Sequence, residues 1–327
     1  MIITRRSFVA TTAGALAVTA VAGPALAQGL PKLKKKDKYK VGFAQTESNN
    51  PWRLAQTQSM KDEATKRGWQ LVYTDAAGSA AKQVADVRSM IAQRVDVILL
   101  SPREEKPLVP AVMEAKKAGI PLFCIDRSVD PEAAKAGRDY VAFIGSDFVK
   151  EGHMAAEAFA KVMNGKAKII ELQGTVGSSP ANDRMRGFKE GIAKFPDMQI
   201  IASQSGDFAR DKGRQVFETL YQAHPDATGL YGHNDEMTMG AIAAMEAAGK
   251  VPGKDIMIAS IDGTKDAAQA VADGKIAVLV ECNPHFGPKA FDSIVAYANG
   301  EKIPEWVVNT DRLFTKDNIA SYLPEAF

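Results

Sequence analysis

The stretch PLFCIDRS, residues 121–128, is an apolar run that ends in an adjacent acid and base, Asp126 and Arg127. A second stretch, IMIASIDG (residues 256–263), ends in the same manner at Asp262. Short apolar runs of this kind are typical of buried strands in parallel sheets. Ligands of such sheets bind just beyond the carboxyl ends of the strands. The two stretches therefore predict polar side chains at the edge of a sheet, where a ligand can reach them.

The same alternation continues along the chain. Apolar runs are separated by longer amphipathic stretches such as 57–68 and 236–250, several of them closed by glycine, as helices often are. This strand-helix-strand pattern predicts an α/β fold with parallel sheets. Residues 28–327, which remain after the N-terminal segment described below, are too many for one comfortable core, so we expect two domains.

Nearly every apolar run ends in polar residues. Helix capping explains Asp75, Asp147 and Asp235, but it does not explain Arg127 or Glu281. The full set of run ends comprises Thr46 to Asn50, Asp75, Ser101, Asp126-Arg127, Asp147, Gln173, Ser205 to Asp207, Asn234-Asp235, Asp262 and Glu281.

Residues 1–27 have the layout of an export signal. Arg5 and Arg6 precede an uncharged stretch that closes on the small-x-small site Ala25-Leu26-Ala27. The paired arginines, with Phe8 two residues on, resemble the twin-arginine signal. The sequence therefore predicts a periplasmic protein with a basic leader at 28–37; an uncleaved membrane anchor is the alternative.

Composition narrows the classes of function. Without the two arginines of the export segment, 41 basic residues become 39 and balance 39 acidic ones, so neither nucleic acid nor an anionic membrane surface is an expected partner. No nucleotide-binding glycine motif occurs, and the four histidines show no metal-ligand spacing or pairing with a nucleophile. We expect no cofactor, no metal site and no catalytic residues. Cys124 and Cys282 are expected to be buried free thiols, with one disulfide as the alternative.

Carboxylates, arginines and amides beside an aromatic face suit a sugar. Each hydroxyl both donates and accepts, so carboxylates and guanidinium groups can serve neighbouring hydroxyls, while the C–H face of the ring packs on an aromatic side chain such as Trp52. The sequence thus predicts a binding site for an uncharged polyhydroxy ligand.

Several ordered segments carry a family resemblance. The chain resembles the type I periplasmic sugar-binding proteins of ABC importers, the ribose-binding-protein group, and within it the members that bind galactofuranose. The segments are SNNPWR (48–53), IDRS (125–128), ELQGTVGSS (171–179), ANDRMRGF (181–188), SQSGDFARDKG (203–213), GHNDEMTMGA (232–241), SIDGT (260–264) and VECNPHFG (280–287).

The resemblance implies a set of ligand-binding residues on both lobes. Trp52 and Phe208 match aromatic positions that pack on the sugar, and the Asp126-Arg127 pair matches one that binds ring hydroxyls. The complete predicted set is Ser48, Asn50, Trp52, Arg53, Asp126, Arg127, Arg184, Phe208, Asn234, Asp262 and Glu281.

Some positions depart from the family pattern. Glu281 stands where ribose binders have glutamine, which weakens an assignment to ribose, and Asn49-Asn50-Pro51, Ser101 and Arg103 differ from the galactofuranose pattern. The expected ligand is a furanose, either galactofuranose or an arabinofuranose-like pentose; another pentose, hexose or polyol is the alternative.

The resemblance also implies architecture and partners. We expect two similar Rossmann-like lobes, at 38–142 plus 282–310 and at 143–281 plus 311–327, joined by three crossings that include residues 127–140 and Glu281-Cys282. A monomer would close its hinge on the sugar and present it to a membrane permease.

Two other classes of protein fit the sequence less well. A sugar-responsive repressor needs an N-terminal DNA-binding segment, where this chain has an export signal. A secreted sugar-modifying enzyme would use Asp126 and Asp262 as paired carboxylates, but the nearby Arg127 and Arg184 disfavour a general acid because a cation lowers a carboxylate pKa. A receptor that is coupled to chemotaxis is a further alternative.

Overall fold

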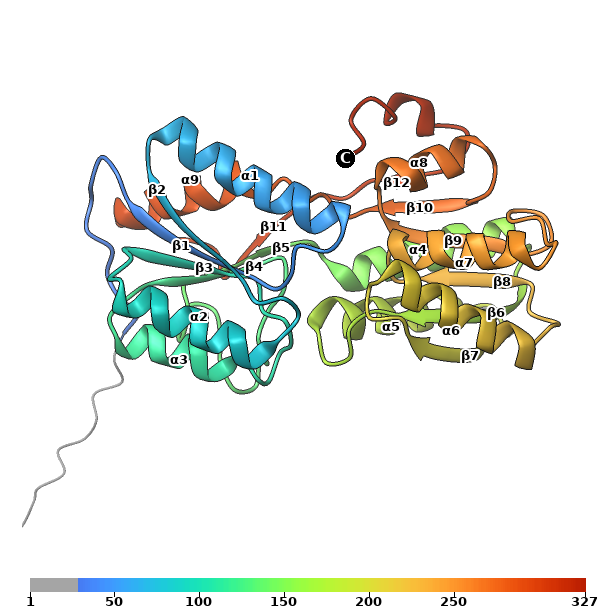
Figure 1. The fold of residues 1–327 in the computed structure, drawn as a ribbon, viewed down its shortest axis with the longest axis horizontal. Coiled ribbons are helices and arrows are strands. Elements are labelled where there is room, and N and C mark those ends of the chain that lie inside the picture. Colours follow the sequence, from blue (N-terminus) through green and yellow to red (C-terminus); the bar gives the residue numbers. More distant parts are fainter. Residues whose placement is uncertain (1–28) are drawn as a thin grey trace, which may run out of the picture.

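The computed structural model describes residues 29–327, and the predicted export signal lies outside them. Two α/β lobes lie side by side, each built on a six-stranded sheet (Figure 1). The strand orders are β11-β5-β4-β3-β1-β2 and β12-β10-β9-β8-β6-β7. The predicted fold class, two similar lobes with parallel-dominated sheets, is confirmed.

The first lobe has an entirely parallel sheet. Helices α1 and α9 cover one face of this sheet, and α2 and α3 cover the other (Figure 1). Its strands are β1 (Lys40–Gln45), β2 (Gln70–Asp75), β3 (Val97–Leu100), β4 (Leu122–Ile125), β5 (Phe143–Gly145) and β11 (Trp306–Val308). Its helices are α1 (Pro51–Arg67), α2 (Ala80–Ala92), α3 (Val109–Lys117) and α9 (Gly287–Ala298).

The second lobe repeats the plan, with one antiparallel edge strand, β12. Helix α4 packs on α5 so closely that a Cβ on Gly187 would lie 2.1 Å from the carbonyl oxygen of Val149, so glycine is required there. The strands are β6 (Lys166–Gln173), β7 (Asp197–Ser205), β8 (Gly229–Gly232), β9 (Met257–Asp262), β10 (Val278–Glu281) and β12 (Leu313–Phe314). The helices are α4 (Phe148–Val162), α5 (Ser179–Ile192), α6 (Arg210–Ala223), α7 (Asp235–Ala247), α8 (Lys265–Ala272) and the short η1 (Ile319–Ser321).

The chain crosses between the lobes three times: between β5 and α4, between β10 and α9, and between β11 and β12. The expected boundary at 142/143 is wrong, because β5 pairs with β4 and β11 in the first sheet. Residues 127–140 are likewise not a crossing, since they connect β4 to β5 within one lobe. The apolar run around Phe143 marks a strand, but a run alone does not say which sheet receives it.

Buried strands form the centre of each lobe. All residues of β3, β4, β8 and β10 are buried. Cys124 and Cys282 are buried free thiols, as predicted. None of the helices in residues 29–327 combines the length and apolar character that crossing a membrane requires.

Candidate ligand-binding site

A cavity lies between the lobes, at the carboxyl ends of strands from both sheets. It contains about 320 Å³ of space not filled by atoms, counted out to where it opens toward solvent. Nine of the eleven predicted site residues line it, together with two that were not predicted, Pro180 and Cys282. The nine are Asn50, Trp52, Arg53, Asp126, Arg127, Arg184, Phe208, Asn234 and Asp262.

The start of α1 positions three of the lining residues. The Asn50 side chain caps the helix by accepting a hydrogen bond of 2.9 Å from the backbone N–H of Arg53, and Pro51 occupies the first helical position. The Trp52 indole N–H donates to the carbonyl oxygen of Cys282 at 2.7 Å, which fixes the ring at a crossing between the lobes. The Arg53 guanidinium lies 4.6 Å from the centroid of the Trp52 ring.

The end of strand β4 supplies an acid and a base to the cavity, Asp126 and Arg127. Asp126 accepts a hydrogen bond of 2.6 Å from Arg53 and is held in a buried ion pair. The Arg127 guanidinium stacks 5.3 Å from the centroid of Phe208, which belongs to the other lobe. Burial, with Arg53 nearby, lowers the pKa of Arg127 to about 9. It still carries its charge at neutral pH.

The second lobe contributes an arginine and a carboxylate. Arg184 on α5 donates to Glu151 at 2.7 Å and to the carbonyl oxygen of His233 at 2.6 Å, and its guanidinium lies 3.6 Å from Asp262. Burial raises the pKa of Asp262 well above its usual range despite the nearby Arg184, so the lowering expected from the sequence is wrong for this carboxylate. Burial also raises the pKa of Glu151 to about 8. Glu151, the His233 carbonyl group and Asp262 therefore surround the Arg184 guanidinium, and of these three Asp262 lines the cavity.

Asn234 lies between the second sheet and the cavity. Its side-chain oxygen caps α7 by accepting from the backbone N–H of Met237 at 3.0 Å. Its amide nitrogen donates to the carbonyl oxygen of Phe208 at 3.3 Å. Helix capping and support of the Phe208 loop therefore fix this side chain.

Left-handed backbone conformations gather around the cavity. Asp126, Asp207, Phe208 and Asp262 have φ values of 63°, 55°, 59° and 138°, a region that residues other than glycine rarely occupy. Such conformations cost about 1–3 kcal/mol each and are retained mainly where function requires a particular side-chain direction.

Two predicted residues lie elsewhere. The Ser48 hydroxyl is hydrogen-bonded to the Tyr73 hydroxyl at 2.6 Å. Glu281 is held by Arg312 in a two-pronged ion pair of 2.7 and 2.9 Å. Neither lines the cavity. Arg312, which pairs with Glu281, lies 31 residues further along the chain. The strand-end pattern alone therefore could not reveal that this carboxylate already has an ion-pair partner.

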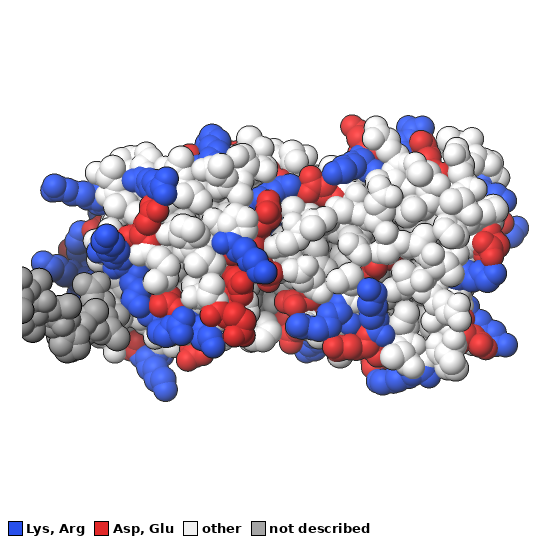
Figure 2. Space-filling view, turned by 90° about the horizontal axis from the view of Figure 1, so that it is seen from below, with Lys and Arg blue, Asp and Glu red and all other residues white. Residues whose placement is uncertain are grey.

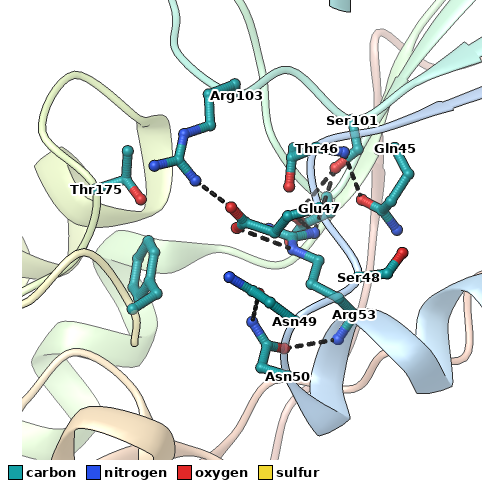
Figure 3. Close-up of polar contacts among 12 residues, drawn as sticks. Gln45, Thr46, Glu47, Ser48, Asn49, Asn50, Arg53, Ser101, Arg103 and Thr175 are labelled. Atoms are coloured by element: carbon teal, nitrogen blue, oxygen red, sulfur yellow. Dashed lines mark hydrogen bonds and ion pairs between the residues drawn. The ribbon is translucent and has the colours of Figure 1, made fainter. Parts of the chain in front are cut away.

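From the sequence we assigned no role to Glu47 and noted Arg103 only as a departure from the family pattern. Both are buried and form an ion pair with each other beside the cavity, with Thr175 facing them from the other lobe (Figure 3). Within residues 29–327, Glu47 Oε1, Arg103 Nε, Arg127 Nε and Thr175 Oγ1 are buried without a hydrogen-bond partner. The sequence offers only weak signals for this pair: Glu47 is one of the polar residues Thr46 to Asn50 that end an apolar run, and Arg103 follows the run end at Ser101.

The described residues contain no group of three or more His, Cys, Asp or Glu side chains arranged to hold a metal ion. What the cavity offers is hydrogen-bonding groups, many of them charged, and two aromatic rings.

Two α/β lobes with a polar cavity at their junction define a two-lobed solute-binding protein. Residues 41–302 match the family described as the periplasmic binding protein domain, and the chain belongs to this family. It is 40% identical to the galactofuranose-binding protein YtfQ of Escherichia coli K12, over 87% of this chain and 88% of that protein.

Two solved structures are also similar. The binding component of the arabinose ABC transporter from Shewanella sp. ANA-3, bound to α- and β-L-arabinofuranose, superposes with a TM-score of 0.83 at 38% identity, covering 88% of this chain and 95% of that one. A Mycobacterium smegmatis protein in complex with β-D-fucofuranose superposes with a TM-score of 0.84 at 42% identity, covering 88% and 94%.

Proposed function

We propose that this protein is the periplasmic receptor of an ABC sugar importer and that it binds one monosaccharide in its furanose form, such as galactofuranose, between its lobes. The observation that carries the proposal is the lining of the cavity: arginines and carboxylates from both lobes converge there with Trp52 and Phe208. The similar proteins from Shewanella and M. smegmatis were solved with furanoses bound.

The charged groups suit neighbouring hydroxyls. Asp126 and Asp262 accept hydrogen bonds from hydroxyls, while Arg127 and Arg184 donate to the same groups. Each hydrogen bond to a charged group contributes about 1.5–3 kcal/mol net, so a few of them support micromolar affinity, about −8 kcal/mol. Existing hydrogen bonds already hold Asp126 and Arg184 in place, which lowers the cost of ordering them when the sugar binds.

Both lobes must contact the ligand at once, so binding favours closure about the three crossings. The closed form is then the state that a membrane permease recognises. We expect the receptor to act as a monomer, which size-exclusion chromatography with light scattering would test.

Calorimetric titration of residues 28–327 tests the ligand class. L-arabinose and D-galactose, both of which form furanose rings in solution, should bind, while D-ribose and myo-inositol should bind more weakly. Asp126→Ala should weaken binding, whereas Asp86→Ala, which alters an ion pair with Lys82 outside the cavity, should not. Binding of an amino acid or nucleoside with no binding of any carbohydrate would overturn the proposal. Conversion of a furanoside to products would instead favour an enzyme.

Export by the twin-arginine route belongs to the same proposal. Replacing Arg5 and Arg6 by lysine should abolish accumulation in the periplasm. Normal export of that variant would point to a different route.

A further inference from the structure

The loop that follows β3 reaches the second lobe outside the sugar cavity. We name residues 101–106, SPREEK, the clasp loop. Its Arg103 forms an ion pair with Glu47 on its own lobe, and its second terminal nitrogen donates to Asp207 on the other lobe at 2.8 Å. Neither Arg103 nor Asp207 lines the cavity.

The same loop makes two further contacts with the second lobe. The backbone N–H of Glu105 donates to the carbonyl oxygen of Gly177 at 2.8 Å. The Asn182 amide donates to the Glu105 carboxylate, also at 2.8 Å. One short loop therefore contacts the opposite lobe through three separate hydrogen bonds. Figure 2 shows acidic and basic side chains interspersed along the boundary between the lobes.

The Arg103–Asp207 pair depends on closure because its members belong to different lobes. The Arg103 side chain is 8% exposed and that of Asp207 is 33% exposed, so solvent screens the pair only in part. When the lobes separate, Arg103 retains Glu47 as a partner within the first lobe. Opening therefore costs the interlobe bond without leaving a buried arginine unpaired, and the pair stabilises the closed state alone.

Asp207 is also connected to the cavity through the backbone, because the next residue, Phe208, lines it. It precedes Phe208, and both residues have left-handed backbone conformations, with φ values of 55° and 59°. This turn directs Asp207 toward the clasp loop while Phe208 lines the cavity and stacks on Arg127. Fixing one side chain of such a turn restricts the position of the other.

We infer that Arg103 is a positioning residue for ligand binding: through Asp207 it holds the lobes closed and keeps Phe208 over the bound sugar. The inference rests on the proposed function, since it describes how the same cavity retains its ligand. The clasp slows release of the ligand, because a contact that exists only in the closed state must break before the ligand leaves, whereas association begins from the open state.

Asp207→Asn is the central variant, because it removes the interlobe ion pair and leaves the Arg103–Glu47 pair intact. With L-arabinose as the probe, we expect dissociation about tenfold faster, between the effects of exposed and of buried pairs, with an association rate within about twofold of the unmodified protein. The difference should shrink in 0.5 M NaCl because salt screens a partly exposed pair.

Three further variants separate positioning from folding. Asp207→Glu keeps the charge and should restore slow release in large part. Asp211→Asn removes a charge from the exposed first turn of α6 and should leave release unchanged. Asp207→Asn should add nothing in an Arg103→Met background, since the pair is already broken there. The melting temperatures of the ligand-free variants should match that of the unmodified protein. If the Arg103–Asp207 pair served only to stabilise the fold, these melting temperatures would fall.

Small-angle X-ray scattering without ligand tests the clasp independently of the sugar. At low salt the Asp207→Asn variant should show a larger radius of gyration than the unmodified protein, because fewer molecules are closed. An unchanged radius, or an unchanged dissociation rate, would overturn the clasp. If no sugar binds the unmodified protein but its radius responds to Asp207→Asn, the proposed function fails and the clasp stands.

Discussion

Gly174 directly follows β6 and controls where Phe208 lies. A Cβ added at this position would lie 1.9 Å from Cζ of Phe208, and 2.3 and 2.4 Å from its two Cε atoms. Carbon atoms in contact prefer about 3.5–4.0 Å, so in Gly174→Ala the ring must move by roughly 1.6 Å or more. The ring lines the cavity, and its displacement there relieves the clash.

The displacement should weaken sugar binding more than it weakens the fold. Moving the ring disturbs its stacking on Arg127, a type of contact that contributes about 0.5–2 kcal/mol, and it removes packing against the ligand. We expect a loss of about 1–2 kcal/mol in binding, roughly 5- to 30-fold in Kd. The melting temperature should change little, because the ring moves into the cavity instead of overpacking the core.

Calorimetric titration with L-arabinose, paired with thermal unfolding, measures both quantities. The double variant Gly174→Ala with Phe208→Leu is the matched control: the smaller side chain removes most of the clash, so its affinity should equal that of Phe208→Leu alone. Full affinity in Gly174→Ala would refute the reasoning, as would a large loss of stability without a loss of binding.

Three further predictions concern single residues. Asp262→Ala should cost about 2–5 kcal/mol of sugar binding, measured by calorimetry, because it removes an acceptor in a closed cavity; unchanged affinity would remove this residue from the site. Glu281→Gln should leave affinity within about twofold but lower the free energy of unfolding by about 1–2 kcal/mol, since the carboxylate is buried on Arg312 away from the cavity; a large loss of affinity in titration would contradict the placement. Burial lowers the pKa of His233, so the unfolded chain binds a proton more readily than the folded protein. The stability contributed by the neutral, buried imidazole is therefore present above the unfolded pKa, near 6.5, and is lost as pH falls through the folded pKa. Denaturant unfolding between pH 7.5 and 5 should show that decline at up to about 1.4 kcal/mol per pH unit, and His233→Gln should reduce it; an equal slope in both proteins would exclude His233 as its source.

The sequence pattern predicted which side chains line the cavity where neighbours in sequence decide the structure. Polar residues directly after apolar runs, such as Asp126 and Asp262, line the cavity because parallel strands share one carboxyl edge. The pattern was wrong in placing Glu281 at the cavity, because this carboxylate forms an ion pair with Arg312, which lies in a later segment of the chain.

The sequence pattern does not predict interactions between residues that are far apart in the chain. Glu47 and Arg103 are 56 residues apart, and Arg103 and Asp207 are 104 residues apart. Neither pair has a local signature, since charge complementarity across such distances is visible only once the lobes are assembled. The misplaced lobe boundary at Phe143 has the same origin, because strand propensity does not specify which sheet a strand joins.

Two of the three tryptophans are bonded to the crossings between the lobes. The Trp52 indole N–H donates to the Cys282 carbonyl oxygen, and that of Trp306 donates to the Gly145 carbonyl oxygen at 3.0 Å. Trp69 instead stacks on Phe291 within the first lobe. The intrinsic emission of the unlabelled protein should therefore contain two hinge-sensitive components over one constant background, and the spectra of Trp52→Phe and Trp306→Phe would report each crossing separately.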